Sequence, residues 1–239
     1  MEVSTAGNSR ILFRVMTTVR SIVKRVTSPF FKAWLRYYYR KPRPYSYDGV
    51  TVQVHPDVFP PHLTLSTKIL LDFISEIDLK DKTFLELGCG SGIISLVARK
   101  RGAKVTASDI NETALEYLQS ASEKNDLALQ CVHSDLFQNI AEDQFDYIII
   151  NPPYYPKEPK SVKEQAWFCG VEFEYFEALF NQLPKYLTPG NETFMILSQD
   201  CEISRINAMA KTKGITYTQS KRIRKMGEEN FIFRLMVAS

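Results

Sequence analysis

The sequence predicts an α/β fold, in which a mostly parallel, doubly wound sheet carries helices on both faces and an antiparallel hairpin at one edge. Three observations predict it. Short apolar runs alternate with helical patterns along most of the chain. The last two runs follow each other without a clear helix between them. Finally, 239 residues with 44% apolar content are enough for a sizeable core.

The elements follow in order from the first strand, VTVQV at residues 50–54, in which apolar and polar residues alternate. Residues 67–77 have helical periodicity. Five strands separated by helical patterns are then expected at 83–87, 104–108, 129–133, 146–150 and 193–197. Strands at 216–220 and 230–237 complete the set as the antiparallel hairpin. These last seven strands predict a seven-stranded sheet.

Charge divides the chain into two parts. The formal net charge of +3 conceals ten Lys and Arg against the single Glu2 in residues 1–44, which leaves −6 for the rest. Pro42 and Pro44 predict a break in regular structure. We therefore expect a basic amino-terminal segment over residues 1–47 and one α/β domain over residues 48–239.

The four cysteines are widely spaced and form no CxxC pair or His/Cys cluster. The spacing therefore predicts neither a disulfide framework nor a zinc site, and no metal is expected. Reduced cysteines are typical of an intracellular protein, so a cytoplasmic location is expected.

The basic segment predicts an amphipathic helix over residues 11–26. Its apolar residues fall on one face, and four Arg and Lys together with the preceding Arg10 fall on the other. Charges interrupt every apolar run before the ~18 residues that a membrane span needs. The apolar face is Ile11, Leu12, Val15, Met16, Val19, Ile22, Val23 and Val26.

Several uses of this segment remain open. It can pack on the α/β domain, lie on a membrane surface, or contact RNA or a ribosome through residues 1–44. An Arg- and Thr-rich composition with almost no acids is also similar to a mitochondrial transit peptide.

The first chemical motif is FLELGCGSGII, at the end of the expected strand 83–87. Gly88, Gly90 and Gly92 allow a sharp turn into the next helix and let backbone amides approach a ligand, while Glu86 adds a carboxylate. A tight turn without any ligand is the alternative. The spacing GxGxG followed by Ile93 lacks the third glycine of the dinucleotide fingerprint, which counts against a dehydrogenase.

Two further acids end the next strands. Asp109 follows VTAS and can accept both hydroxyl hydrogens of a ribose, although it can also cap a helix over residues 112–120. Asp135 can accept from an adenine amino group, with Leu136 and Phe137 against the ring, or it can be a simple turn residue.

NPPYYP, residues 151–156, follows the apolar run 147–150. Two prolines fix the backbone and end a strand, so a rigid turn is one interpretation. The other interpretation is that the rigid turn holds the Asn151 amide and the two tyrosines toward a ligand.

With these loops in this order, residues 58–238 resemble the class I S-adenosylmethionine-dependent methyltransferases, and NPPY resembles their amino-group branch. The resemblance implies a Rossmann-like fold with S-adenosyl-L-methionine as cofactor. It implies that the glycine loop and Glu86 surround the methionine part and that Asp109 binds the ribose, with Ile110 beside it. Asp135 and Leu136 are implied at the adenine, and Asn151, Pro152 and Tyr154 at the target nitrogen.

Such a target nitrogen is a poor nucleophile, because its lone pair is delocalised into a carbonyl group or a ring. The Asn151 side-chain oxygen and the Pro152 carbonyl can accept its two hydrogens and aim the lone pair at the methyl group. Tyr154 can stack on the planar group. No strong base is needed, because the nitrogen becomes acidic as it gains the methyl group.

The sequence leaves two kinds of methyl acceptor possible. One is a glutamine of a ribosomal protein or translation factor, and the other is an amino group of an RNA or DNA base. The domain is net acidic, and KEPKSVKEQ (157–165) is the only obvious cationic rim. The alternative to an enzyme is an RNA- or membrane-binding protein that retains an inactive methyltransferase fold.

Overall fold

The computed structural model describes residues 40–142, 145–225 and 227–238. The chain forms two compact units, residues 1–41 and 42–239. The helix expected over residues 11–26 lies outside the described residues. No helix within them has both the length and the apolar content needed to cross a bilayer.

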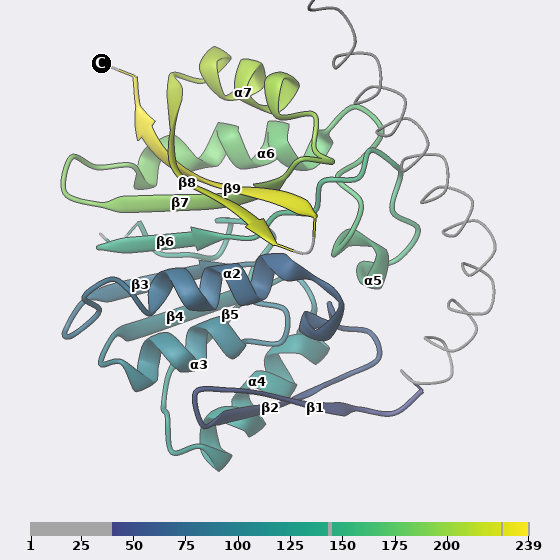
Figure 1. Cartoon of the computed structure of the whole chain (residues 1–239), viewed down its shortest axis with the longest axis vertical. Helices are drawn as coiled ribbons and strands as arrows, with labels where there is room; N and C mark the ends of the chain where they lie inside the picture. The colour runs from purple at the N-terminus through teal and green to yellow at the C-terminus, as the bar shows by residue number, and fades with distance from the viewer. Residues whose placement is uncertain (1–39, 143–144, 226, 239) are drawn as a thin grey trace, which may run out of the picture. The chain divides into compact units, whose positions relative to one another are not determined.

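The second unit is built on a seven-stranded sheet of order β5-β4-β3-β6-β7-β9-β8 (Figure 1). Five strands are parallel: β3 (Thr83–Leu87), β4 (Lys104–Asp109), β5 (Gln130–His133), β6 (Tyr147–Ile150) and β7 (Glu192–Ser198). At one edge of the sheet, β8 (Ile215–Lys225) and β9 (Glu228–Val237) form an antiparallel pair, and β9 is also antiparallel to β7. The predicted fold class is confirmed.

Helices cover both faces of this sheet. Figure 1 shows α2 (Leu65–Ile74), α3 (Ile93–Lys100) and α4 (Glu112–Lys124) on one face. The other face carries α6 (Glu174–Gln182) and α7 (Ile203–Thr212). Three short helices complete the set: η1 (Pro61–Leu63), α5 (Val162–Gln165) and η2 (Leu183–Tyr186).

The central strands are mostly apolar because each serves two cores. In β3, Phe84 belongs to the core under α2 to α4, whereas Leu85 belongs to the core under α6 and α7. Ile149 and Ile150 divide in the same way on β6. Side chains alternate between the faces of a strand, so a strand that is covered on both faces carries apolar side chains on both.

A strand that the sequence analysis missed precedes the α/β part. β1 (Arg43–Tyr47) pairs with β2 (Val50–Val54) in a two-stranded sheet, and Asp48 and Gly49 both have positive φ between them. An Asp-Gly pair between two short strands is the usual signal for such a turn. The hairpin spans the boundary expected after residue 47, and the division between the units falls after Lys41.

The hairpin packs on α3 and α4 and fixes the start of the segment that leads to the sheet. Val50, Val52 and Val54 are buried in the same core as those helices. The Asn125 side chain, just after α4, accepts from Thr51 N at 3.1 Å and donates to Thr51 O at 2.9 Å. The hairpin and these two hydrogen bonds therefore fix the position at which residues 55–60 begin.

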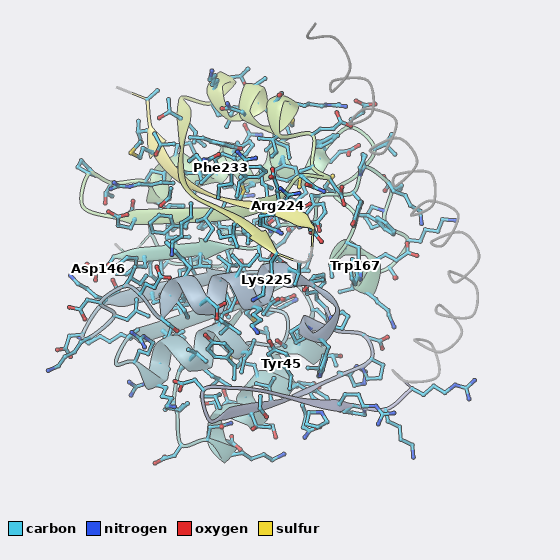
Figure 2. All side chains as sticks on the ribbon, viewed as in Figure 1. Tyr45, Asp146, Trp167, Arg224, Lys225 and Phe233 are labelled. Carbon is cyan, nitrogen blue, oxygen red and sulfur yellow. The ribbon has the colours of Figure 1, made fainter. Side chains whose placement is uncertain are left out.

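Because β3 to β6 are parallel, the loops that follow them meet at the carboxyl edge of the sheet. The opposite edge is fastened by Asp146, whose Oδ2 accepts from Thr83 N at 2.8 Å and Thr83 Oγ1 at 3.0 Å. Figure 2 shows Asp146 at one end of the sheet and Trp167 at the other, where those loops lie.

Candidate active site

A cavity of about 510 Å³ lies at the carboxyl edge of the sheet. Most of the predicted site residues line it: Glu86, Gly88, Gly90, Asp109, Ile110, Asp135, Leu136, Asn151, Pro152 and Tyr154. The four loops that the sequence singled out therefore meet at one space, and its size is typical of a site for a small ligand.

The glycine loop, residues 88–92, leaves open space in the cavity, but most of its backbone amides are already hydrogen-bonded within the protein. Gly88 has φ +74, and a Cβ placed there would have nothing within 4 Å. The amides of Gly88 and Cys89 both donate to Ser108 O, at 2.9 and 2.8 Å, and Gly90 N donates to Asp109 Oδ2 at 2.7 Å. The expectation that this loop presents its amides to a ligand is therefore not met at these three positions.

Gly92 is a predicted site residue that does not line the cavity. It precedes α3 with φ +69, and a Cβ there would lie 2.3 Å from Cδ1 of Leu118 on α4. The third glycine therefore makes room for a neighbouring helix.

Glu86 lies in the cavity wall with a side chain that is almost fully buried. Its Oε2 accepts from Ser95 N at 2.8 Å and from the Ser95 hydroxyl. Burial raises the pKa of Glu86 to about 8, although the two bonds from Ser95 oppose the shift. At neutral pH this carboxyl group is therefore largely protonated.

Asp109 is held by the backbone on both sides. Its Oδ2 accepts from Gly90 N, and its Oδ1 accepts from Asn111 N at 2.9 Å. Burial raises the pKa of Asp109, and those two backbone bonds oppose it. The alternative of a helix cap is wrong, because α4 is capped by Asn111, whose side chain accepts from Thr113 N at 3.1 Å.

The loop after β5 turns at Leu136, which has φ +51. The Ser134 hydroxyl donates to Leu136 O at 2.8 Å and fixes this turn. Asp135 and Leu136 line the cavity, but Phe137 does not. The expected contact of Phe137 with a ligand is wrong, since its ring stacks on Tyr186 in the core, with centroids 4.2 Å apart.

The NPPYYP segment leaves β6 along the cavity wall. Asn151, Pro152 and Tyr154 line the cavity, and the rings of Tyr154 and Tyr155 lie 4.7 Å apart. The pKa of Tyr154 is raised mainly by burial and to a smaller extent by the neighbouring Tyr155. Tyr154 is therefore a neutral phenol at physiological pH.

The segment after NPPYYP returns to the site and pairs with it. Tyr155 N donates to Trp167 O at 3.1 Å, and Cys169 N donates to Tyr155 O at 3.0 Å. This brings Gln165 and Trp167 into the cavity wall, and Oε1 of Gln165 is buried there without a hydrogen-bond partner among the described residues. Sequence reasoning missed Trp167, because no local pattern indicates this return.

A second segment, directly after the β1–β2 hairpin, forms the facing part of the wall. Phe59 and Trp167 lie with ring centroids 4.7 Å apart at an angle of 49°. Lys163 Nζ lies 3.1 Å from Oδ1 of Asp57. In α2, Thr67 also lines the cavity.

The cavity wall is acidic. Among the described residues that line it, none is Lys, Arg or His. From the expected cationic rim of residues 157–165, two lysines lie beside the wall, where Lys163 pairs with Asp57 and Lys157 lies over the Phe168 ring at 4.2 Å. The six acids of the wall are Asp57, Glu86, Asp109, Asp135, Glu158 and Glu174.

Comparison with known proteins gives a consistent family. Residues 49–222 match the methyltransferase small domain family. A protein of Methanocaldococcus jannaschii, described as a candidate protein N5-glutamine methyltransferase, is 33% identical over 149 residues, which are 60% of this chain and 73% of that protein. The ribosomal RNA small subunit methyltransferase C of Haemophilus influenzae is 36% identical over 165 residues, 64% of this chain and 49% of that protein. The chain thus spans about half of this second relative.

Solved structures share the fold. RsmC of T. thermophilus, a 16S rRNA methyltransferase in complex with AdoMet and guanosine, superposes with a TM-score of 0.62 at 21% identity, over 83% of this chain and 50% of that one. The Mtq2–Trm112 complex of E. cuniculi, which methylates a translation termination factor, gives a TM-score of 0.59 at 22% identity. That match covers 77% of this chain and 99% of the other.

Proposed function

The chain belongs to the methyltransferase small domain family and is an S-adenosylmethionine-dependent N-methyltransferase, and on that premise we propose that it methylates the side-chain amide of a protein glutamine. One observation carries the proposal. Asn151 and Pro152, at the end of β6, open into the same cavity as the glycine loop and Asp109.

The cavity fits this cofactor in three respects. The missing Cβ of Gly88 leaves open space beside the backbone. The wall is acidic, which suits a ligand with a sulfonium and an ammonium group and disfavours a diphosphate. The amides of the glycine loop are already bonded, so the loop offers little to a phosphate. When bound, S-adenosylmethionine supplies an electrophilic methyl group.

Each predicted residue then has a part in holding that ligand. Asp109 accepts from ribose hydroxyls, with Ile110 beside it, while Asp135 accepts from the adenine amino group and Leu136 contacts the ring. Glu86 lies behind the glycine loop and fixes the start of α3 through Ser95.

The chemistry belongs to Asn151 and Pro152. The Asn151 side-chain oxygen and the Pro152 carbonyl accept the two hydrogens of the amide nitrogen, which turns its lone pair toward the methyl group. Tyr154 stacks on the planar amide and stays protonated. As the nitrogen gains the methyl group, one of its protons becomes acidic and passes to solvent, so no strong base is required.

Glutamine is preferred to a nucleobase because of charge. Glu86 is protonated and Asp57 pairs with Lys163, which leaves four unpaired acids in the wall and no Lys, Arg or His among its described residues. These acids repel a phosphate backbone, and the α/β part of the chain is net acidic. The M. jannaschii relative is described as acting on glutamine. A nucleobase amino group is the second candidate, favoured by the rings of Phe59, Tyr154 and Trp167 in the wall.

The basic amino-terminal segment has a separate part in this proposal. Its expected amphipathic helix and excess of cations suit contact with an anionic membrane surface or a ribosome, which would bring the enzyme to its substrate. A cytoplasmic location with peripheral attachment follows from the same proposal.

The proposal is tested with S-adenosylmethionine labelled in its methyl group, added with the protein to cell lysate. We expect label in protease-sensitive material, with N-methylglutamine in its complete protease digest. Nuclease-sensitive label would instead assign a nucleobase. The Asn151→Ala variant is the control for labelling by other enzymes of the lysate.

A further inference from the structure

Two segments that lie far apart in the sequence meet over the glycine loop. One holds Asp57 to Phe59, and the other runs from Val162 to Phe168. A Cβ on Gly90 would lie 3.7 Å from Cβ of Phe59, so Phe59 packs directly against this loop. The Phe59 ring in turn contacts Trp167, with centroids 4.7 Å apart. The aromatic pair Phe59–Trp167 is therefore a wall of the cavity next to Gly90.

This wall is joined to both sides of the site. Trp167 O accepts from Tyr155 N at 3.1 Å, which ties it to the NPPYYP segment. Gly90 N donates a hydrogen bond to Asp109, the residue proposed to bind the ribose. In S-adenosylmethionine the sulfonium lies between the ribose and the amino-acid end. Asp109, the aromatic pair and Asn151 line the same cavity, so a ligand that reaches from Asp109 toward Asn151 has the aromatic pair in the wall beside it.

The surroundings favour a positive charge at that place. Ring faces attract cations through their quadrupole, most strongly when solvent is excluded. Besides the protonated Glu86, the wall holds five acids, of which Asp57 is paired with Lys163, and no Lys, Arg or His among its described residues. A neutral ligand of the same shape gains nothing from either feature.

We propose that the aromatic pair Phe59–Trp167 distinguishes the cationic methyl donor from its neutral product. Methyl transfer breaks the bond between sulfur and the methyl carbon, and the sulfonium becomes a thioether with no charge. The attraction to the rings ends at that step, so the product is held less firmly than the donor was. The proposal concerns the cofactor alone and is independent of the identity of the acceptor.

The test compares two affinities, those for S-adenosylmethionine and S-adenosylhomocysteine, measured by calorimetry on the full chain. Trp167→Leu removes the ring and keeps an apolar side chain, while Trp167→Phe is the matched control that keeps a ring. We expect Trp167→Leu to weaken donor binding by about 2- to 30-fold and product binding by at most about twofold. Trp167→Phe should preserve most of the wild-type ratio.

A second readout follows the ring itself. The sequence holds two tryptophans, so Trp34→Phe leaves Trp167 as the single tryptophan and the source of the tryptophan fluorescence. Its fluorescence should change more on saturation with the donor than with the product.

Equal weakening of both affinities by Trp167→Leu would assign the ring to packing and overturn the proposal. Unchanged affinities with a raised KM for a protein or nucleic acid acceptor would also overturn it, because the pair would then bind the acceptor. If Trp167→Leu does not fold, Phe59→Leu with Phe59→Tyr as its control tests the other ring by the same ratio.

Discussion

Glu86 illustrates how burial controls a single group. In the folded chain the carboxyl has a pKa of about 8, mainly because it is buried, whereas an exposed glutamate has one of 4.5. Between these values the unfolded chain has lost the proton and the folded chain retains it. The folded state then binds more protons, so stability falls as pH rises through this range.

Glu86→Gln should remove this dependence. The amide cannot ionise and its oxygen can still accept from Ser95 N. We expect the free energy of unfolding of the wild type, measured by urea denaturation, to fall relative to the variant from pH 5 to pH 9. Curves that stay parallel over this range would show that Glu86 has an ordinary pKa.

Asn151 is the residue on which the proposed chemistry depends. If its side-chain oxygen orients the acceptor nitrogen chiefly in the transition state, Asn151→Ala should lower kcat by about a hundredfold or more. Affinity for S-adenosylmethionine should change by no more than a few-fold, since Asp109 and the glycine loop are intact. Single-turnover kinetics together with calorimetry check both parts. A rate near that of the wild type would contradict the assigned role.

At the scale of elements, the glycine loop serves packing as well as binding. Gly92 starts α3 in a left-handed conformation and lies against Leu118 of α4. The distance between the two helices thus depends on the absence of one side chain. This explains why three glycines follow β3 although only Gly88 and Gly90 line the cavity.

Gly92→Ala should therefore destabilise the chain, by about 2–4 kcal/mol for the clash with Leu118 and the left-handed backbone together. The double variant with Leu118→Ala should cost less than the sum of the single variants, because the shorter side chain removes the clash. Urea denaturation measures all three. Gly190→Ala is the control, since a Cβ there meets nothing within 4 Å. Strict additivity would place the strain elsewhere.

The whole molecule combines an acidic catalytic unit with a strongly basic segment. Residues 1–41 contain nine Lys and Arg against Glu2, and the four loops of the site lie entirely in the unit of residues 42–239. The two units therefore have different partners in our proposal. The amino-terminal segment binds an anionic surface, and the other unit binds the cofactor and the acceptor.

Deletion of residues 1–41 should leave the affinity for S-adenosylmethionine unchanged and abolish binding to an anionic surface. The full chain should sediment with anionic vesicles or with ribosomes at low salt and be released at high salt, because its cations act through a screened field. If truncation removes the thermal transition, the segment packs on the core instead. Binding of the truncated form to the same surface would also contradict the proposal.

The carboxyl edge of the sheet was predictable because each cue is local. Apolar runs alternate with helical patterns, and parallel strands place their carboxyl ends together, so Gly88, Asp109, Asp135 and Asn151 were expected at one edge. The β1–β2 hairpin could also have been found from Asp48-Gly49. Each of these features is encoded within a few residues.

The sequence by itself determined the α/β fold, the side of the sheet that carries the site and the loops that form it. Only the tertiary structure decided that Phe137 turns into the core, that Gly92 faces Leu118, and that Phe59 meets Trp167. Such contacts join segments separated by tens of residues. They depend on how all the intervening elements pack, and no local pattern of residues specifies the distance between two elements that meet only in the folded chain.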